Sequence, residues 1–193
     1  MKLEKIVVIS ILLSSLAAHA QVPGTSPPLQ QIPNPPAAMK DGVVLSDKAL
    51  VENAMQSLAT QVELSKIANQ NVSDEKVREY AGWILKDYEP AIAQLRQLAA
   101  DARIDTPKAL DADHSKIVAS LREQPGPQSG ARYIELIKTE HDNLLTLLDI
   151  AHGQSTVAPE FREFGDKLVP TLKQYQKRAQ TLQKANIGQA ASQ

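Results

Sequence analysis

Cysteine is absent from the 193-residue sequence. A chain without thiols has no disulfide framework, no thiolate metal site and no lipid-anchored cysteine behind a leader. Aromatic residues make up only 4% of the chain, whereas alanine, leucine, lysine, glutamate and glutamine are plentiful. These are residues with high helix propensity. The composition therefore predicts an all-α protein that relies on helix packing for its stability.

Long apolar runs are also missing, and the most apolar stretch lies at the N-terminus. Residues 6–17 form an apolar segment of about a dozen residues, which is shorter than the ~20 that a spanning helix needs. Two lysines precede this segment, and Ala18-His19-Ala20 follows it as a small-x-small cleavage site. We expect residues 1–20 to be a secretory signal peptide, removed before Gln21, with no transmembrane segment left after cleavage. An uncleaved anchor is the alternative.

Neither sign of charge dominates. Cleavage after residue 20 would remove two lysines and one glutamate, which changes the formal net charge from −1 to −2. A nucleic-acid partner would require a basic face, so this class of partner is not expected. The sequence predicts a protein located in a periplasm or otherwise exported, with outer-membrane association possible. Its expected partner is an unidentified protein or a component of the cell envelope.

Proline is concentrated ahead of the periodic part of the chain. Six of the twelve prolines fall within residues 21–41, and such segments favour extended conformers with little to bury. We interpret residues 21–42 as a disordered tether, residues 43–187 as one folded domain and residues 188–193 as a disordered tail. The alternative is that this segment is a proline-rich ligand recognised by a partner protein.

Four long segments carry apolar residues at helical spacing. They are approximately Ser46–Gln70, Asp74–Ala102, Tyr133–His152 and Pro159–Asn186. Ser46 and Ser73 are the expected N-caps of the first two. The long stretch Arg103–Gly130 separates the second and third segments and contains a short helix at Ala112–Arg122. This stretch is long enough to run the length of a helix, so the second and third long helices can lie parallel. The prediction is a ferritin-like four-helix bundle with a long crossover that carries a short extra helix.

Each long helix has one polar residue near the middle of its apolar stripe. These residues are Gln61, Tyr88, His141 and Tyr175. A bundle would bring them to a similar depth, where imidazole and phenol groups can satisfy one another as a buried hydrogen-bond cluster. The alternative is a small-ligand pocket or a single transition-metal ion with His141 as the leading ligand. Asp87 and Glu140 adjoin this cluster and could orient Tyr88 or His141.

Four short motifs resemble the bacterial domain-of-unknown-function 4142 family. They are Val62–Ala68, Lys86-Asp87-Tyr88, Tyr133-Ile134-Glu135 followed by Glu140-His141, and Leu168-Val169-Pro170 followed by Leu172. The resemblance covers roughly Ser46–Leu182. It implies an exported protein with a ferritin-like fold, of a kind often labelled as an outer-membrane protein and without an established activity.

The chain departs from this family at the interior positions. Family members usually carry Glu at the position of Gln61 and His at those of Tyr88 and Tyr175, so only His141 matches. A di-metal bundle also requires Glu-x-x-His motifs, and none occurs in the sequence. We therefore expect a non-enzymatic binding or envelope- or stress-associated protein. The alternative is a metal-binding, ferritin-like protein with a degenerate site centred on His141, and no cofactor is favoured.

Overall fold

The computed structural model describes residues 44–126 and 128–190. Within them the chain forms five α-helices: α1 (Asp47–Asn71), α2 (Glu75–Asp101), α3 (Ala112–Arg122), α4 (Ser129–Gly153) and α5 (Pro159–Ala190). The predicted all-α class is confirmed, since these residues contain no strand. The predicted signal peptide (1–20), the tether (21–42) and residues 191–193 of the predicted tail lie outside the described residues.

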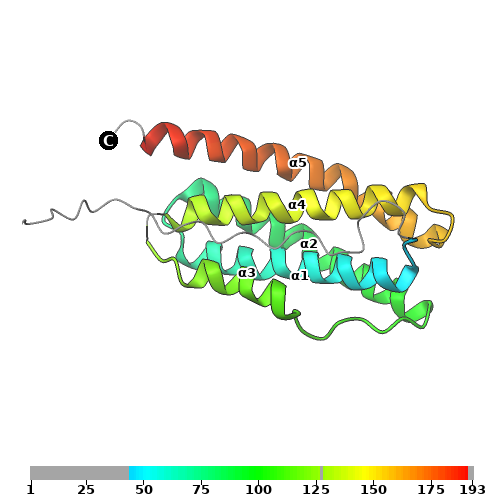
Figure 1. Cartoon of the computed structure of the whole chain (residues 1–193). Helices are drawn as coiled ribbons and strands as arrows, with labels where there is room; N and C mark the ends of the chain where they lie inside the picture. Colours follow the sequence, from blue (N-terminus) through cyan, green and yellow to red (C-terminus); the bar gives the residue numbers. More distant parts are fainter. Residues whose placement is uncertain (1–43, 127, 191–193) are drawn as a thin grey trace, which may run out of the picture. The chain divides into compact units, whose positions relative to one another are not determined.

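The four long helices pack so that each contacts two others. Helix α1 contacts α2 and α4, and α5 contacts the same two helices. Figure 1 shows that α2 and α4 run in the same direction and that α1 and α5 run opposite to them. The connection after α2 returns along the bundle before α3, which packs against α1 and α4. The structure therefore confirms the long crossover with a short extra helix, and α2 and α4 are parallel.

The caps of the first two helices differ in how well the sequence predicted them. Ser46 caps α1 as predicted, because its hydroxyl accepts from the backbone N–H of Ala49 at 3.2 Å. The prediction of Ser73 for α2 was wrong, since Asp74 is the N-cap. The Asp74 carboxylate accepts from the N–H groups of Lys76 and Val77 at 2.9 and 3.3 Å. A carboxylate can serve two donors and also favours the positive end of the helix dipole, which explains the shift by one residue.

Two predicted helix boundaries were too short. Helix α5 continues to Ala190, so the tail predicted at 188–193 begins inside a helix; no proline stops it, and one glycine costs only about 1 kcal/mol. Helix α4 begins at Ser129 rather than Tyr133. Gly130, which the sequence analysis placed at the end of the connection, is a buried helical residue, and a Cβ there would lie 3.2 Å from Val72 Cγ1. Close packing, and not chain flexibility, accounts for this glycine.

The core fills the space between the long helices with aliphatic and aromatic side chains. Leu58, Ile84 and Leu172 are fully buried, one from each of α1, α2 and α5. Pro90 and Pro170 lie inside α2 and α5 but on exposed faces, where water can reach the backbone carbonyls that lose a partner. Among the described helices, none is long and apolar enough to cross a membrane.

Two glycines inside helices should respond differently to alanine. Gly82→Ala is expected to raise the free energy of unfolding by roughly 0.5–1 kcal/mol, because nothing lies within 4 Å of the added Cβ and alanine is the better helix former. Gly165→Ala should gain clearly less, since its Cβ would lie 3.1 Å from Leu148 Cδ2. Urea denaturation of both variants tests this, and equal gains would contradict the close α4–α5 packing.

Candidate functional site

Three of the four predicted interior residues meet in the middle of the bundle. Tyr88 from α2 and His141 from α4 form a hydrogen bond of 2.8 Å between Oη and Nε2. The Tyr175 ring from α5 stacks on the His141 ring, with centroids 6.4 Å apart and an interplanar angle of 15°. It also meets the Tyr88 ring edge-on at 5.7 Å. Tyr88 and His141 are fully buried, and Tyr175 is 6% exposed.

Gln61 is fully buried as predicted, but its bond goes to its own helix. Its Nε2 donates to Ser57 Oγ at 3.2 Å. Among the described residues, Gln61 Oε1 and His141 Nδ1 are buried without a hydrogen-bond partner. When Tyr88 donates to Nε2 of His141, Nδ1 carries the proton of the neutral imidazole, so the cluster leaves one donor and one acceptor unpaired. The expected self-satisfied network is therefore only partly formed, at a cost of about 1–3 kcal/mol per unpaired group.

Asp87 orients a different residue from those predicted. Its carboxylate accepts from Tyr175 Oη at 2.6 Å, and Trp83 O also accepts from this hydroxyl at 3.1 Å. Asp87 itself is exposed at the rim of the bundle. Burial raises the pKa of the Tyr175 phenol, and the bond to Asp87 raises it further. The prediction that Asp87 orients Tyr88 or His141 is thus corrected: it holds Tyr175, because the next residue on a helix points about 100° away.

Glu140 likewise faces away from His141. Its carboxylate accepts from Ser57 Oγ at 3.0 Å, and the residue is 2% exposed. Burial raises the pKa of this carboxyl, although the charge of His114 and the Ser57 bond act against the shift. Ser57 therefore joins Glu140 of α4 to Gln61 of α1. The sequence offered a signal for Ser57, which lies one turn before Gln61 on the same helix face.

The other two tyrosines extend the cluster along the bundle. All four tyrosines of the chain are buried. Tyr133 shares a 2.8 Å hydrogen bond with Ser65, and Tyr80 Oη donates to the Tyr175 carbonyl oxygen at 3.1 Å. The Tyr80 ring meets Tyr133 at 6.2 Å and Tyr175 at 5.8 Å, both edge-on. Edge-to-face pairs of this kind add to the packing energy, so these rings belong to the core.

Electrostatics keeps the interior groups neutral. Burial lowers the pKa of His141 to about 3, and burial, followed by the neighbouring phenols, raises the pKa of Tyr88 well above its ordinary value. A metal bound by His141 with tyrosinate help would need deprotonated phenols, which this environment opposes. In the part of the chain that the structure describes, no three His, Cys, Asp or Glu side chains gather closely enough to hold a metal ion.

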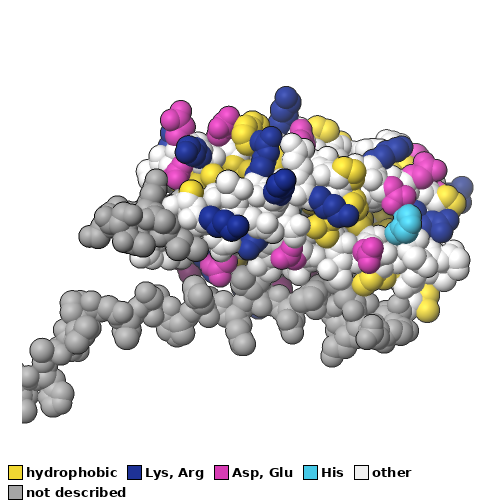
Figure 2. All heavy atoms as spheres, turned by 90° about the horizontal axis from the view of Figure 1, so that it is seen from above, with side chains coloured by type: hydrophobic (Ala, Val, Ile, Leu, Met, Phe, Trp, Pro, Cys, Tyr) yellow, Lys and Arg dark blue, Asp and Glu magenta, His cyan; other side chains and the backbone are white. Residues whose placement is uncertain are grey.

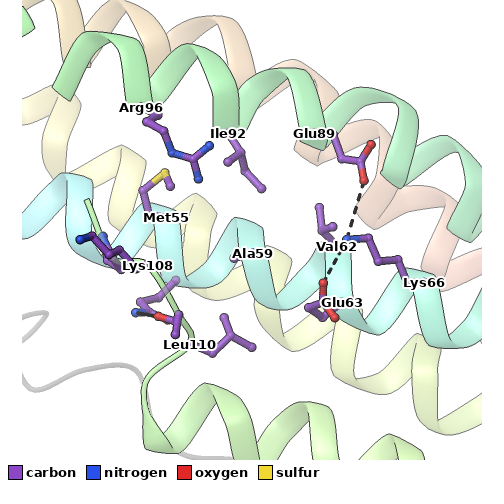
Figure 3. A pocket seen from close by; sticks show the side chains of 13 residues that line it. Met55, Ala59, Val62, Glu63, Lys66, Glu89, Ile92, Arg96, Lys108 and Leu110 are labelled. Atoms are coloured by element: carbon purple, nitrogen blue, oxygen red, sulfur yellow. Dashed lines mark hydrogen bonds and ion pairs between the residues drawn. The ribbon is translucent and has the colours of Figure 1, made fainter. Parts of the chain in front are cut away.

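A second candidate site is an open pocket that the sequence did not reveal. It has a volume of about 540 Å³ and lies between α1, α2 and the connection at residues 107–110 (Figure 3). Gln56 fixes the wall of this pocket. Its Nε2 donates to the Ala109 carbonyl oxygen and its Oε1 accepts from the Asp111 N–H, both at 3.1 Å. The connection has no helical periodicity, so nothing in the sequence placed it against α1.

The charges of this pocket are divided between its two ends (Figure 3). At one end, Lys66 pairs with Glu63 at 3.0 Å and with Glu89 at 3.9 Å, which links α1 to α2. Arg96 and Lys108 lie at the other end. Neither forms an ion pair with any described residue. Apolar side chains line the pocket between the ends: Met55, Ala59, Val62, Ile92 and Leu110.

Removing single phenol hydroxyls should separate the two tyrosines that contact His141. Tyr88→Phe is expected to lower the free energy of unfolding by about 1–3 kcal/mol, because it leaves the buried Nε2 of His141 unpaired. Tyr175→Phe should cost less, since its partner Asp87 is exposed and water can replace the bond. Both substitutions preserve the ring contacts, so each serves as the volume control for the other in urea denaturation. A larger loss for Tyr175→Phe would contradict this arrangement.

Comparison with known proteins identifies the family of the chain and a solved structure with a similar fold. A crystal structure of a DUF305 fragment from Deinococcus radiodurans is similar, with a TM-score of 0.62 and 14% identity over 72% of this chain and 95% of that chain. At this identity the likeness concerns the fold alone, and a relationship to ferritins stays a prediction. No curated protein matches the chain. The family model described as "Domain of unknown function (DUF4142)" matches residues 32–182, and the chain belongs to this family.

Proposed function

We propose that this protein is an exported, non-enzymatic domain that binds a small ligand in the pocket between α1, α2 and residues 107–110. The observation that carries the proposal is the pocket itself: about 540 Å³, within the range of roughly 300–1,000 Å³ usual for ligand sites. Its apolar middle and charged ends provide both contact area and orientation. The interior cluster lacks such access, because its side chains are at most 6% exposed and a substrate would have to open the core.

A metal-binding function centred on His141 is the second candidate. The unpaired Oε1 of Gln61 and Nδ1 of His141 favour it, since both lie in the bundle interior. Nδ1 can bind a metal only in the tautomer in which Nε2 carries the proton and donates to Tyr88. The raised phenol pKa of Tyr88 counts against it. A site with one histidine and one amide would be a weak ligand set for a transition metal. The binding function therefore has the better support.

Export rests on the pattern of residues 1–20, and the surface is compatible with it. Figure 2 shows Lys and Arg interspersed with Asp and Glu on the face that carries α5, as suits a freely dissolved domain. The protein recovered from the exported fraction is expected to begin at Gln21 when its intact mass is measured. A mass that includes Met1–Ala20 would contradict cleavage, and recovery from the cytoplasm alone would contradict export.

A neutral fluorescent probe tests the pocket. N-phenyl-1-naphthylamine brightens in apolar surroundings, and we expect it to bind the wild type with saturable fluorescence. Ala59→Trp should abolish this binding, because the indole would fill the middle of the pocket from α1. Ala131→Trp is the matched control, as Ala131 is exposed on α4 outside the pocket. Circular dichroism verifies that both variants fold, and Ala59→Leu provides a smaller filling. Absence of probe binding, or equal binding by Ala59→Trp, would refute the proposed function.

A further inference from the structure

We propose that the ligand of this pocket is an amphipathic carboxylate, with its head at Arg96 and Lys108 and its acyl chain along the apolar middle. This inference rests on the proposed binding function of the same pocket. Three features lead to it: unpaired cations at one end, excess negative charge at the other and a strip of aliphatic side chains between them. Together they define which end of a ligand is charged, the sign of that charge and the nature of the rest.

The head site follows from two cations without partners. In Figure 3 the Arg96 side chain extends from α2 over the pocket toward Met55, and Lys108 lies at the same end on the connection. Among the described residues neither has an acidic partner, whereas Lys66 in the same pocket has two. The planar guanidinium matches the two oxygens of a carboxylate, and the ammonium adds a second donor. An anionic head would therefore be held where the protein leaves positive charge uncompensated.

The opposite end fixes the direction of binding. Glu63 and Glu89 both face Lys66, so two carboxylates share one ammonium and this end carries one net negative charge. An anionic head is repelled there and attracted at Arg96, which leaves a single orientation for a monocarboxylate. A dicarboxylate would place its second charge beside Glu63 and Glu89. A cationic amphiphile would be drawn to the wrong end, so the charge pattern discriminates by sign.

The middle of the pocket suits a flexible alkyl chain. Ala59 and Val62 from α1, Ile92 from α2 and Leu110 from the connection line it. Met55 adds an adaptable, unbranched side chain, which fits irregular apolar surfaces. Each buried methylene contributes about 0.8 kcal/mol, which corresponds to roughly fourfold in affinity. Affinity should therefore rise about fourfold per methylene until the apolar strip is covered, and then stay constant.

Gln56 is a positioning residue for this site. Its amide forms both bonds that hold the connection against α1, to Ala109 and to Asp111. Leu110 and Lys108 are carried by that connection, so the apolar wall and one cation depend on Gln56. Gln56→Ala should weaken binding of the carboxylate and of the neutral probe together. Loss of Arg96 alone should weaken only the carboxylate.

The test is displacement of N-phenyl-1-naphthylamine from the full mature chain by three amphiphiles of equal length. Decanoate and decyltrimethylammonium are used below their critical micelle concentrations, and decanol below its solubility limit. We expect decanoate to displace the probe at about tenfold lower concentration than decanol, the equivalent of one charge-assisted hydrogen bond. The cation should be the weakest. Arg96→Gln with Lys108→Gln should remove the preference for decanoate and spare decanol. Lys173→Gln, an exposed lysine on α5, is the matched control and should change nothing.

The outcomes separate this inference from the proposed function. If the probe binds but decanoate competes no better than decanol, or the double variant keeps the preference, the carboxylate assignment is wrong and the binding function stands. Preference for the cation would also overturn it. If the probe fails to bind at all, the proposed function itself is wrong. Flotation with phosphatidylglycerol vesicles that depends on Arg96, without displacement by free decanoate, would assign these cations to a membrane contact and refute the inference.

Discussion

Acidification from pH 7 to pH 3 is expected to remove roughly 4 kcal/mol of the free energy of unfolding through His141 alone. Burial lowers the pKa of His141 to about 3 in the folded chain, from 6.5 for the exposed group. Between these values the unfolded chain takes up a proton that the folded chain does not. The contribution of His141 to the free energy of unfolding is therefore fully present above pH 6.5. It falls by about 1.4 kcal/mol per pH unit as the pH is lowered toward 3.

Glu140 acts in the opposite direction. Burial raises the pKa of its carboxyl above 4.5 in the folded chain, so the unfolded chain loses this proton first as the pH rises. The contribution of Glu140 is therefore present below pH 4.5 and is lost as the pH rises through its folded pKa. The pH range in which Glu140 titrates begins at 4.5, within the range of pH 3 to 6.5 in which His141 affects stability. On acidification through this shared range Glu140 adds stability while His141 removes it, so the two effects partly cancel in the wild type.

Two non-titrating variants resolve these contributions. His141→Gln and Glu140→Gln are compared with the wild type by urea denaturation between pH 4 and pH 8. Glu140→Gln should show a steeper loss of stability on acidification than the wild type, because only the His141 effect remains. His141→Gln should show a shallower loss or a gain. Differences in slope are compared, since each substitution also changes the absolute stability. Parallel curves for the wild type and His141→Gln would contradict a buried, neutral His141.

The fold could be predicted because its determinants are local and periodic. The apolar stripes predicted the four long helices, and Arg103–Gly130 is long enough for a connection that returns along the bundle, as observed. The boundaries were less predictable because they depend on contacts distant in sequence. Gly130, for example, lies in α4 where the helix packs closely against Val72. The N-cap of α2 is a different case: its hydrogen bonds are local, and Ser73 and Asp74 are neighbouring residues that are both common N-caps.

The sequence predicted which polar side chains of the site are buried, but it did not predict their hydrogen-bond partners. One polar residue per stripe identified side chains that would be buried, and Tyr88, His141 and Tyr175 do meet. Which atoms form hydrogen bonds depends on small rotations of each helix about its axis, and these rotations cannot be inferred from the sequence. Tyr175 thus donates to Asp87, and Gln61 donates to Ser57. The pocket escaped prediction because an aperiodic segment forms one of its walls.

Replacing His141 with alanine should be the most damaging single substitution in the cluster. We expect a loss of about 3–5 kcal/mol in the free energy of unfolding, since the deletion leaves the buried Tyr88 hydroxyl unpaired and adds a cavity. Tyr88→Phe is the control that breaks the same bond without a cavity, so the difference between the two variants measures the cavity term. Equal losses would mean that the surrounding rings collapse into the space.

The His141→Ala variant also distinguishes the proposed ligand-binding function from the alternative of a metal site at His141. If His141 is a core residue, added Zn²⁺, Mn²⁺ or Cu²⁺ should leave the melting temperature of the wild type unchanged. A metal site would instead stabilise the wild type by RT ln(1 + [L]/Kd), about 2.7 kcal/mol at a hundredfold excess over Kd. That response would disappear in His141→Ala. A response that survives in His141→Ala would come from side chains elsewhere, such as His152, which is exposed and paired with Asp166 at 2.8 Å. Only a metal-dependent rise in melting temperature that is lost in His141→Ala would favour a metal site in the bundle interior over ligand binding in the surface pocket.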